Sequence, residues 1–172
     1  MKYPVLTCAD QKGKNKMHIR DYMEELLQFY KAEKQWLDLL PIISSAINCE
    51  ELKENLKRFY TRGKQGLEWL RSIINVEEKN LKFYENEDIV LLTDECYDII
   101  DITPRNSFIR NSGVIISLQL IQQYLIEMCT KLLQGVVHHR ETHLISGLQT
   151  ILDGKKQEEE ILALSGAETA IN

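Results

Sequence analysis

Apolar residues in this sequence recur every three or four positions over four long stretches, a spacing that predicts amphipathic helices. The first stretch begins at Ile19 and extends to about Ile43, and the second covers residues 50–76. The third is predicted to be capped by Asn111 or Ser112 and to end near Gly135, and the fourth carries apolar positions between 144 and 162. No single helix of this kind buries its apolar stripe alone. The pattern therefore predicts an all-α four-helix bundle.

Prolines and glycines interrupt this pattern at few places, since the chain contains only three prolines and eight glycines. Pro41 lies inside the first stretch and is expected to kink that helix, or to end its regular hydrogen bonding about one turn earlier. Gly63 and Gly66 lie in the middle of the second stretch, where each costs roughly 1 kcal/mol relative to alanine. We expect a neighbouring helix or a bulky side chain to come close to them.

Residues 77–111 form a polar connection that is longer than a hairpin between neighbouring helices requires. Ile89, Leu92 and Cys96 share the spacing of one short helix within it, and Pro104 is predicted to end that helix. We interpret this segment as a long crossover that carries a short extra helix between the second and third long helices and returns the chain along the bundle.

The length of 172 residues and a hydrophobic content of 44% suit a single domain with one core. Residues 1–16 are expected to form a polar N-terminal tail, and residues 17–172 the single helical domain. The net charge is −5, and no basic stripe with interleaved aromatic residues supports a nucleic-acid partner. No segment approaches the ~20 apolar residues of a membrane span, so no membrane association is expected.

The four cysteines lie far apart and form no C-x-x-C pair, which fits neither a disulfide framework nor a zinc site. A reducing cytoplasm is therefore the expected compartment. No glycine-rich phosphate loop, nucleophile elbow or Cys/His catalytic pair is present, so the sequence gives no support for enzymatic activity. His138, His139 and His143 include a pair four residues apart that would suit zinc, but no HExxH motif accompanies them. We interpret them as solvated residues near a helix junction.

Charged residues occupy two positions where the helical spacing calls for an apolar residue. On the first helix the stripe passes from Phe29 through Glu33, and on the fourth it passes through Lys155 to Glu159. An unpaired buried charge costs several kcal/mol, so buried charges normally have a partner, a metal ion or water. Either these side chains lie at the rim of their stripes and reach solvent, or the bundle has a polar centre.

Three short motifs follow one another along the chain. The run FYKAEKQWL at residues 29–37, followed by Leu40-Pro41, is similar to the motif that opens the YciE/YciF-type stress proteins. CEELKE at residues 49–54 resembles the start of their second helix, and LQTILD at residues 148–153 resembles a stretch of their last helix. The resemblance covers residues 18–172. It implies a ferritin-like bundle, a stress-associated role and a homodimer formed through helix faces, for which the first two helices offer aromatic residues.

Metal binding in that family would need carboxylates and histidines that converge from all four long helices. At the matching positions this sequence keeps a carboxylate on the first helix, but an arginine replaces the ligand on the second. The third helix keeps only a tyrosine, and the fourth has a lysine before its last acidic position. The residues at this degenerate site are Glu33, Arg62, Gln122, Gln123, Tyr124, Lys155 and Glu159.

A guanidinium and an ammonium group can supply the positive charge that a metal would bring to the centre of the bundle. We therefore predict a buried cluster in which Arg62 and Lys155 pair with Glu33 and Glu159, with no metal, cofactor or catalytic activity. One alternative is a di-iron-type protein with a shifted ligand set of Glu33, Glu127, Glu159 and a histidine. Another is an adaptor or immunity-type helical protein of unrelated ancestry.

Overall fold

The computed structural model describes residues 8–74, 86–139 and 142–171 of the chain, and within these ranges all regular structure is helical. Side chains at the ends of three of the helices (residues 8–21, 138–143 and 168–171) lie outside the description. The helices are α1 Cys8–Ala46, α2 Glu50–Ile74, α3 Glu87–Ile102, α4 Phe108–His139 and α5 Thr142–Ile171. Among the described residues, none of these helices has both the length and the hydropathy needed to cross a membrane.

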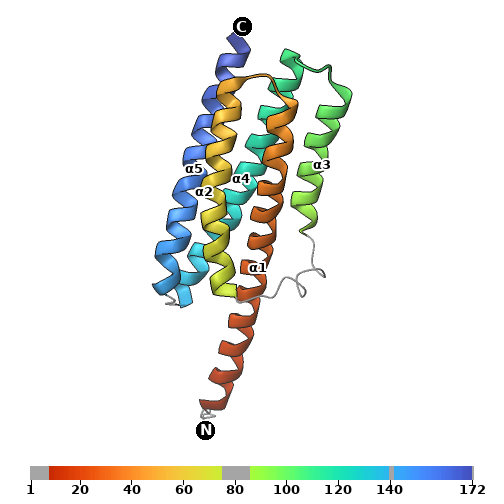
Figure 1. The fold of residues 1–172 in the computed structure, drawn as a ribbon. Coiled ribbons are helices and arrows are strands. Elements are labelled where there is room, and N and C mark those ends of the chain that lie inside the picture. Colours follow the sequence, from red (N-terminus) through yellow and green to blue (C-terminus); the bar gives the residue numbers. More distant parts are fainter. Residues whose placement is uncertain (1–7, 75–85, 140–141, 172) are drawn as a thin grey trace.

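Four of these helices, α1, α2, α4 and α5, run side by side as a bundle, and α3 packs against α1 and α4 (Figure 1). Helices α2 and α4 point in the same direction, so the chain must return along the bundle between them. Figure 1 shows that α3 makes this return, which leads the chain back to the end at which α2 begins. The prediction of a four-helix bundle with a crossover helix is therefore confirmed.

Helix α1 is longer at both ends than the sequence pattern indicated. It begins at Cys8 rather than Ile19, so residues 8–16 of the expected N-terminal tail are helical. Polar residues of fair helix propensity extend a helix that its buried part has already nucleated. Pro41 removes one backbone hydrogen bond, but α1 continues to Ala46 because the flanking Leu40 and Ile43 are buried in the core. The alternative that Pro41 ends the regular hydrogen bonding of this helix about one turn earlier is therefore wrong.

The ends of α4 also differ from the prediction. The hydroxyl of Ser107 accepts a hydrogen bond from the backbone N–H of Arg110 at 3.1 Å, so Ser107 rather than Asn111 or Ser112 caps this helix. Gly135 does not end α4, which continues to His139. A Cβ atom at Gly135 would lie 3.6 Å from the Tyr22 ring of α1. This glycine therefore lies at a contact between two helices and not at a C-cap.

The two glycines within α2 lie where large side chains of other helices approach. A Cβ atom at Gly63 would lie 2.5 Å from Cδ2 of Leu37 on α1, which is too close for any residue but glycine without movement of the leucine. A Cβ atom at Gly66 would lie 3.3 Å from Cγ1 of Ile151 on α5. The expected close approach at both positions is confirmed.

A buried arginine holds one end of the bundle together. Arg110, at the start of α4, is only 5% exposed, and its guanidinium donates to the backbone carbonyls of Ala46, Ile100 and Thr103. These carbonyls lie in the last turn of α1 and at the end of α3, where helix carbonyls lack partners and carry partial negative charge. Arg110 therefore joins the C-terminal ends of two helices to the beginning of a third.

Candidate functional site

The two residues that interrupt the apolar stripes lie together in the middle of the bundle. Glu33 on α1 and Lys155 on α5 are only 2% and 3% exposed, so neither lies at the rim. The ammonium Nζ of Lys155 lies 2.9 Å from Oε2 of Glu33 and 3.6 Å from Oε2 of Glu158, which is 1% exposed. One lysine therefore lies between two buried carboxylates from two helices.

An amide from a third helix completes this group. Gln122 on α4 is fully buried, and its Nε2 donates to Oε2 of Glu158 at 3.0 Å and to the backbone carbonyl of Lys155 at 2.9 Å. The indole ring of Trp36 also faces the ammonium, with Lys155 Nζ 5.4 Å from the ring centroid. We call Glu33, Gln122, Lys155 and Glu158 the buried cluster.

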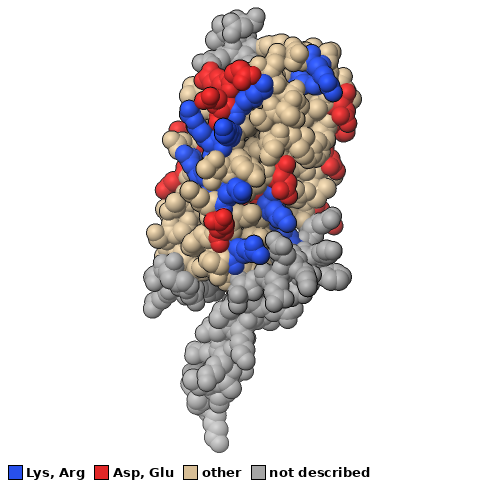
Figure 2. Space-filling view, viewed as in Figure 1, with Lys and Arg blue, Asp and Glu red and all other residues tan. Residues whose placement is uncertain are grey.

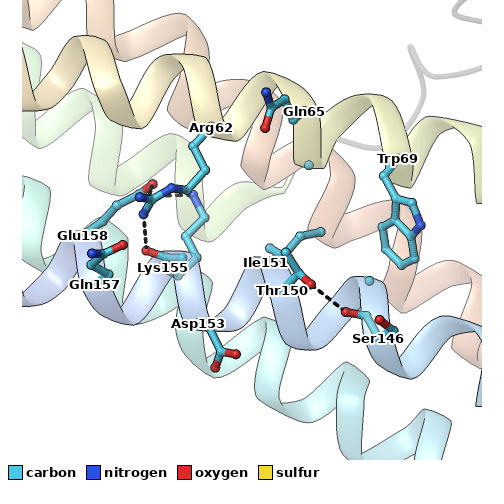
Figure 3. A pocket seen from close by; sticks show the side chains of 13 residues that line it. Arg62, Gln65, Trp69, Ser146, Thr150, Ile151, Asp153, Lys155, Gln157 and Glu158 are labelled. Carbon is cyan, nitrogen blue, oxygen red and sulfur yellow. Dashed lines mark hydrogen bonds and ion pairs between the residues drawn. The ribbon is translucent and has the colours of Figure 1, made fainter.

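Arg62 touches the buried cluster from outside. Its side chain is 45% exposed and reaches from α2 across to α5, as Figure 3 shows. The guanidinium Nη1 donates to the carbonyl of Gly154 at 3.3 Å and lies 3.9 Å from Oε1 of Glu158. The expectation that Arg62 is buried with the other charges is therefore wrong. Gly154 has no Cβ, which lets the long side chain lie across α5 towards solvent.

Three other residues assigned to the centre from the sequence do not join the cluster. Glu159 is only partly buried, and Glu158 takes the inward position, because Glu158 lies three residues after Lys155 on the same helical face. Gln123 is exposed. Tyr124 is half-buried on another side of α4, where its hydroxyl donates to Oδ1 of Asn86 at 2.9 Å. Successive helical residues are rotated by about 100°, so only Gln122 of this run faces the centre.

The charges in the cluster depend on one another. Burial raises the pKa of the Glu33 carboxyl, and the nearby ammonium of Lys155 only partly offsets that effect. Burial alone would favour a neutral Lys155, but the carboxylates of Glu33 and Glu158 outweigh it and raise the pKa of the lysine. Lys155 therefore remains protonated at neutral pH. With Arg62 at the rim, two cations face two carboxylates.

Comparison with known proteins places the chain in a family. Residues 19–169 match the model of a family described as a domain of unknown function (DUF892). The chain belongs to the DUF892 family. The fold of this DUF892 member is similar to the crystal structure of the E. coli stress protein YciF, with a TM-score of 0.81, 18% sequence identity and coverage of 90% of this chain and 98% of that chain.

These comparisons confirm the resemblance to YciF-type proteins and the ferritin-like helical bundle. At 18% identity, the match to YciF establishes the fold of this DUF892 member and no more. No match was found among curated proteins. Membership of the family also removes the alternative of a helical protein with unrelated ancestry.

The buried residues of this DUF892 member do not fit a pair of metal ions. The ammonium of Lys155 lies between the two carboxylates that a cation would need. The buried atoms without a hydrogen-bond partner among the described residues include Nε1 of Trp36, which carries a hydrogen and cannot bind a metal, besides Oε1 of Glu33 and Oε1 of Gln122. Hard divalent cations need several converging oxygen ligands, and this centre offers two carboxylates with the ammonium of Lys155 already between them.

The three carboxylates of the shifted ligand set considered from the sequence do not converge either. Glu33 is buried, Glu127 is exposed on α4, and Glu159 is partly buried on α5. Within the described ranges, no group of three or more His, Cys, Asp or Glu side chains has a geometry that could hold a metal ion. The side chains of His138, His139 and His143 lie outside the described residues.

Proposed function

We propose that this protein is a non-catalytic ferritin-like bundle in which a buried lysine takes the place of a metal centre, and that its role is structural or partner-binding. The observation that carries the proposal is the position of Lys155 Nζ, 2.9 Å from Glu33 and 3.6 Å from Glu158. The description of YciF as a stress protein supports an association with stress.

A lysine ammonium supplies positive charge but cannot do the chemistry of a metal centre. It has no vacant coordination position and no redox change, so it offsets part of the charge of Glu33 and Glu158 without activating dioxygen or water. Its ammonium lies 2.9 Å from a carboxylate oxygen of Glu33 and 3.6 Å from one of Glu158. The proposed role of the cluster is therefore to specify the packing of α1, α4 and α5.

Metal analysis tests this proposal. The protein is purified without chelators or a histidine tag, and its metal content is measured before and after anaerobic incubation with ferrous iron. We expect far less than one metal ion per chain in both samples. A stoichiometric content of iron, manganese or zinc would overturn the proposal and favour a di-iron-type protein that uses a shifted ligand set.

A pair of charge substitutions on α5 makes the test sharper. Lys155→Glu replaces the buried ammonium with a third carboxylate, whereas Lys156→Glu makes the same change of charge at an exposed neighbour. If the lysine replaces a metal, divalent ions should raise the melting temperature of Lys155→Glu but not that of Lys156→Glu or the unsubstituted chain. An equal response of all three proteins would contradict the substitution of lysine for metal.

We also propose a homodimer, and the exposed apolar surface supports its location on α4. Ile109, Ile116 and Leu120 are 65%, 57% and 44% exposed and lie on one face of this helix, at spacings of seven and four residues. The aromatic residues of α1 and α2 are less suitable than expected from the sequence, since most are buried. The buried ones are Phe29, Tyr30, Trp36 and Phe59.

Light scattering after size exclusion tests the dimer. Ile116→Lys should give a monomer, whereas Gln149→Lys, at an exposed polar position on α5, should leave the dimer unchanged. A chain that is monomeric at every concentration before substitution would refute the proposed dimer.

The proposed partners do not include nucleic acid, and the proposed compartment is the cytoplasm. Figure 2 shows Lys and Arg side chains interspersed with Asp and Glu on the displayed face, without a continuous basic surface. Cys96 and Cys129 are buried free thiols, and Cys49 is a half-buried one, as expected in a reducing compartment. Retention of the protein on immobilised duplex DNA at physiological salt would contradict the first proposal.

A further inference from the structure

A groove of about 800 Å³ lies between α2 and α5, next to the buried cluster. The two helices run in opposite directions, so residues of α2 that come later in the sequence face earlier residues of α5 (Figure 1). This volume is within the range of small-molecule sites in proteins. Figure 3 shows from close by the side chains that line this groove.

Each end of the groove is formed by a long side chain of α2 that lies against a glycine of α5. At one end, a Cβ atom on Gly147 would lie 2.0 Å from Cζ2 of Trp69, so the indole packs directly against the backbone. At the other, a Cβ atom on Gly154 would lie 3.0 Å from Cδ of Arg62. Arg62 and Trp69 are seven residues apart on α2, which puts them on the same face of that helix. The two glycines are likewise seven residues apart on α5.

Between these two ends the groove is lined by one aliphatic side chain, that of Ile151, and by the polar side chains of Gln65 and Thr150. Gly66 lies between Arg62 and Trp69 on α2 and contributes no side chain, and Ile151 of α5 lies opposite it. Seven residues of helix correspond to about 10 Å. The groove therefore has an aromatic end and a cationic end about 10 Å apart, with Gly66 and the side chain of Ile151 between them.

The guanidinium of Arg62, at the cationic end, has more N–H donors than it uses within the described part of the chain. An arginine has five N–H donors in a planar fork, and Arg62 uses Nη1 for the Gly154 carbonyl while Glu158 lies 3.9 Å away. No other described residue accepts a hydrogen bond from this guanidinium. The ammonium of Lys155 also lies 3.6 Å from Glu158, so Arg62 is not the sole cation near this carboxylate, and Figure 3 shows Asp153 pointing away from Arg62. A planar carboxylate would complement the fork with two parallel hydrogen bonds.

We propose that this groove binds an unbranched carboxylate of medium chain length, with its carboxylate on Arg62 and its alkyl chain along Gly66 and Ile151 towards Trp69. An extended chain advances roughly 1.3 Å per C–C bond of about 1.5 Å. A carboxylate of about eight to ten carbons therefore spans the distance of about 10 Å between the two ends. Lys155 and Glu158 also line the groove, but the proposed ligand contacts are made by Arg62, Ile151 and Trp69, so the site does not require that a lysine replaces a metal.

Calorimetric titration of the full chain with saturated carboxylates of six to twelve carbons, below their micellar concentrations, tests the site. Each added methylene should raise the affinity by up to about fourfold until the chain reaches Trp69, after which the gain should stop. Octan-1-ol and octylammonium should bind at least tenfold more weakly than octanoate. Binding should also change the emission of Trp69, since Trp36 is fully buried, and the change should disappear in Trp69→Phe.

Two arginine substitutions on α2 provide a matched pair. Arg62→Gln should lower octanoate affinity at least tenfold, whereas Arg58→Gln should not change it, because Arg58 is 72% exposed, pairs with Glu54 and does not line the groove. Circular dichroism and urea melts establish that both variants are folded. Equal binding by the two variants, equal binding of octanoate and octan-1-ol, or an affinity that still rises at twelve carbons would each overturn the proposal. Loss of octanoate binding in a dimer that buries Trp69 would also overturn it in favour of a second copy as the occupant.

Discussion

Removal of the ammonium of Lys155 should destabilise the bundle strongly. Lys155→Met keeps most of the side-chain volume but leaves Glu33 and Glu158, which are 2% and 1% exposed, without the cation between them. Loss of one partner of a buried ion pair typically costs about 3–5 kcal/mol, because the remaining charge cannot reach water. We therefore expect the free energy of unfolding at pH 7 to fall by about 3–5 kcal/mol.

Urea denaturation followed by circular dichroism measures this change, and two other variants provide controls. Lys156→Met removes the same charge from an exposed position of α5 and should cost less than about 0.5 kcal/mol. Arg62→Ala should cost about 1 kcal/mol or less, because the side chain is 45% exposed and its ion pair with Glu158 is long, at 3.9 Å. A fully buried Arg62 would cause a larger loss of the free energy of unfolding.

The pH dependence provides an independent test of the same argument. The raised pKa of Lys155 means that its contribution is complete below the ordinary lysine pKa and is lost as the pH rises through the higher value in the folded protein. For Glu33, whose pKa burial raises, protonation favours the folded state, so the defect of Lys155→Met should shrink as the pH falls through that raised pKa. A loss below 1 kcal/mol at pH 7, or a defect that grows on acidification, would refute the reasoning.

Two further substitutions and one thiol reaction test other parts of the structure. Arg110→Met should lower stability by about 2–4 kcal/mol in urea melts, because three backbone carbonyls lose a charged donor; a loss below 1 kcal/mol would show that water replaces the guanidinium. Burial raises the pKa of the Cys96 and Cys129 thiols to about 12, so in a Cys8→Ser background a thiol reagent at pH 8 should modify only Cys49 until urea unfolds the protein; rapid native modification of all three thiols would contradict their burial. Gly147→Ala should cost about 1–3 kcal/mol through overpacking and shift the tryptophan emission, since its Cβ would lie 2.0 Å from an indole carbon; unchanged emission would show that the indole does not lie there.

The helical architecture could be predicted from the sequence because it depends on a repeated signal. Apolar spacing over several turns identifies a helix even when single positions deviate, and a connection of thirty-odd residues between two helices requires a return path along the bundle. The same spacing identified Glu33 and Lys155, since a charge within an apolar stripe is visible without any structure. Both are buried, as the interpretation of a polar centre required.

The precise ends of the helices depend on contacts that the sequence pattern does not report. Ser107 caps α4 although two polar residues nearby suit the same function, and α1 continues through Pro41 because its neighbours are held in the core. Gly135 has the residue type of a helix end, yet it lies at a contact with Tyr22 of α1. A local pattern cannot distinguish these cases, because the deciding partner is distant in the sequence.

The hydrophobic periodicity is sufficient to predict an amphipathic helical bundle with charges at its centre. Which charges meet there depends on how the helices pack against one another. A shift of one residue rotates a helical side chain by about 100°, so Glu158 lies inside and Glu159 only partly so, and Gln122 faces the centre while Gln123 is exposed. The position of Arg62 at the rim depends on Gly154 of α5. Periodicity along one helix specifies a face, but the partners of that face are specified by the register between helices.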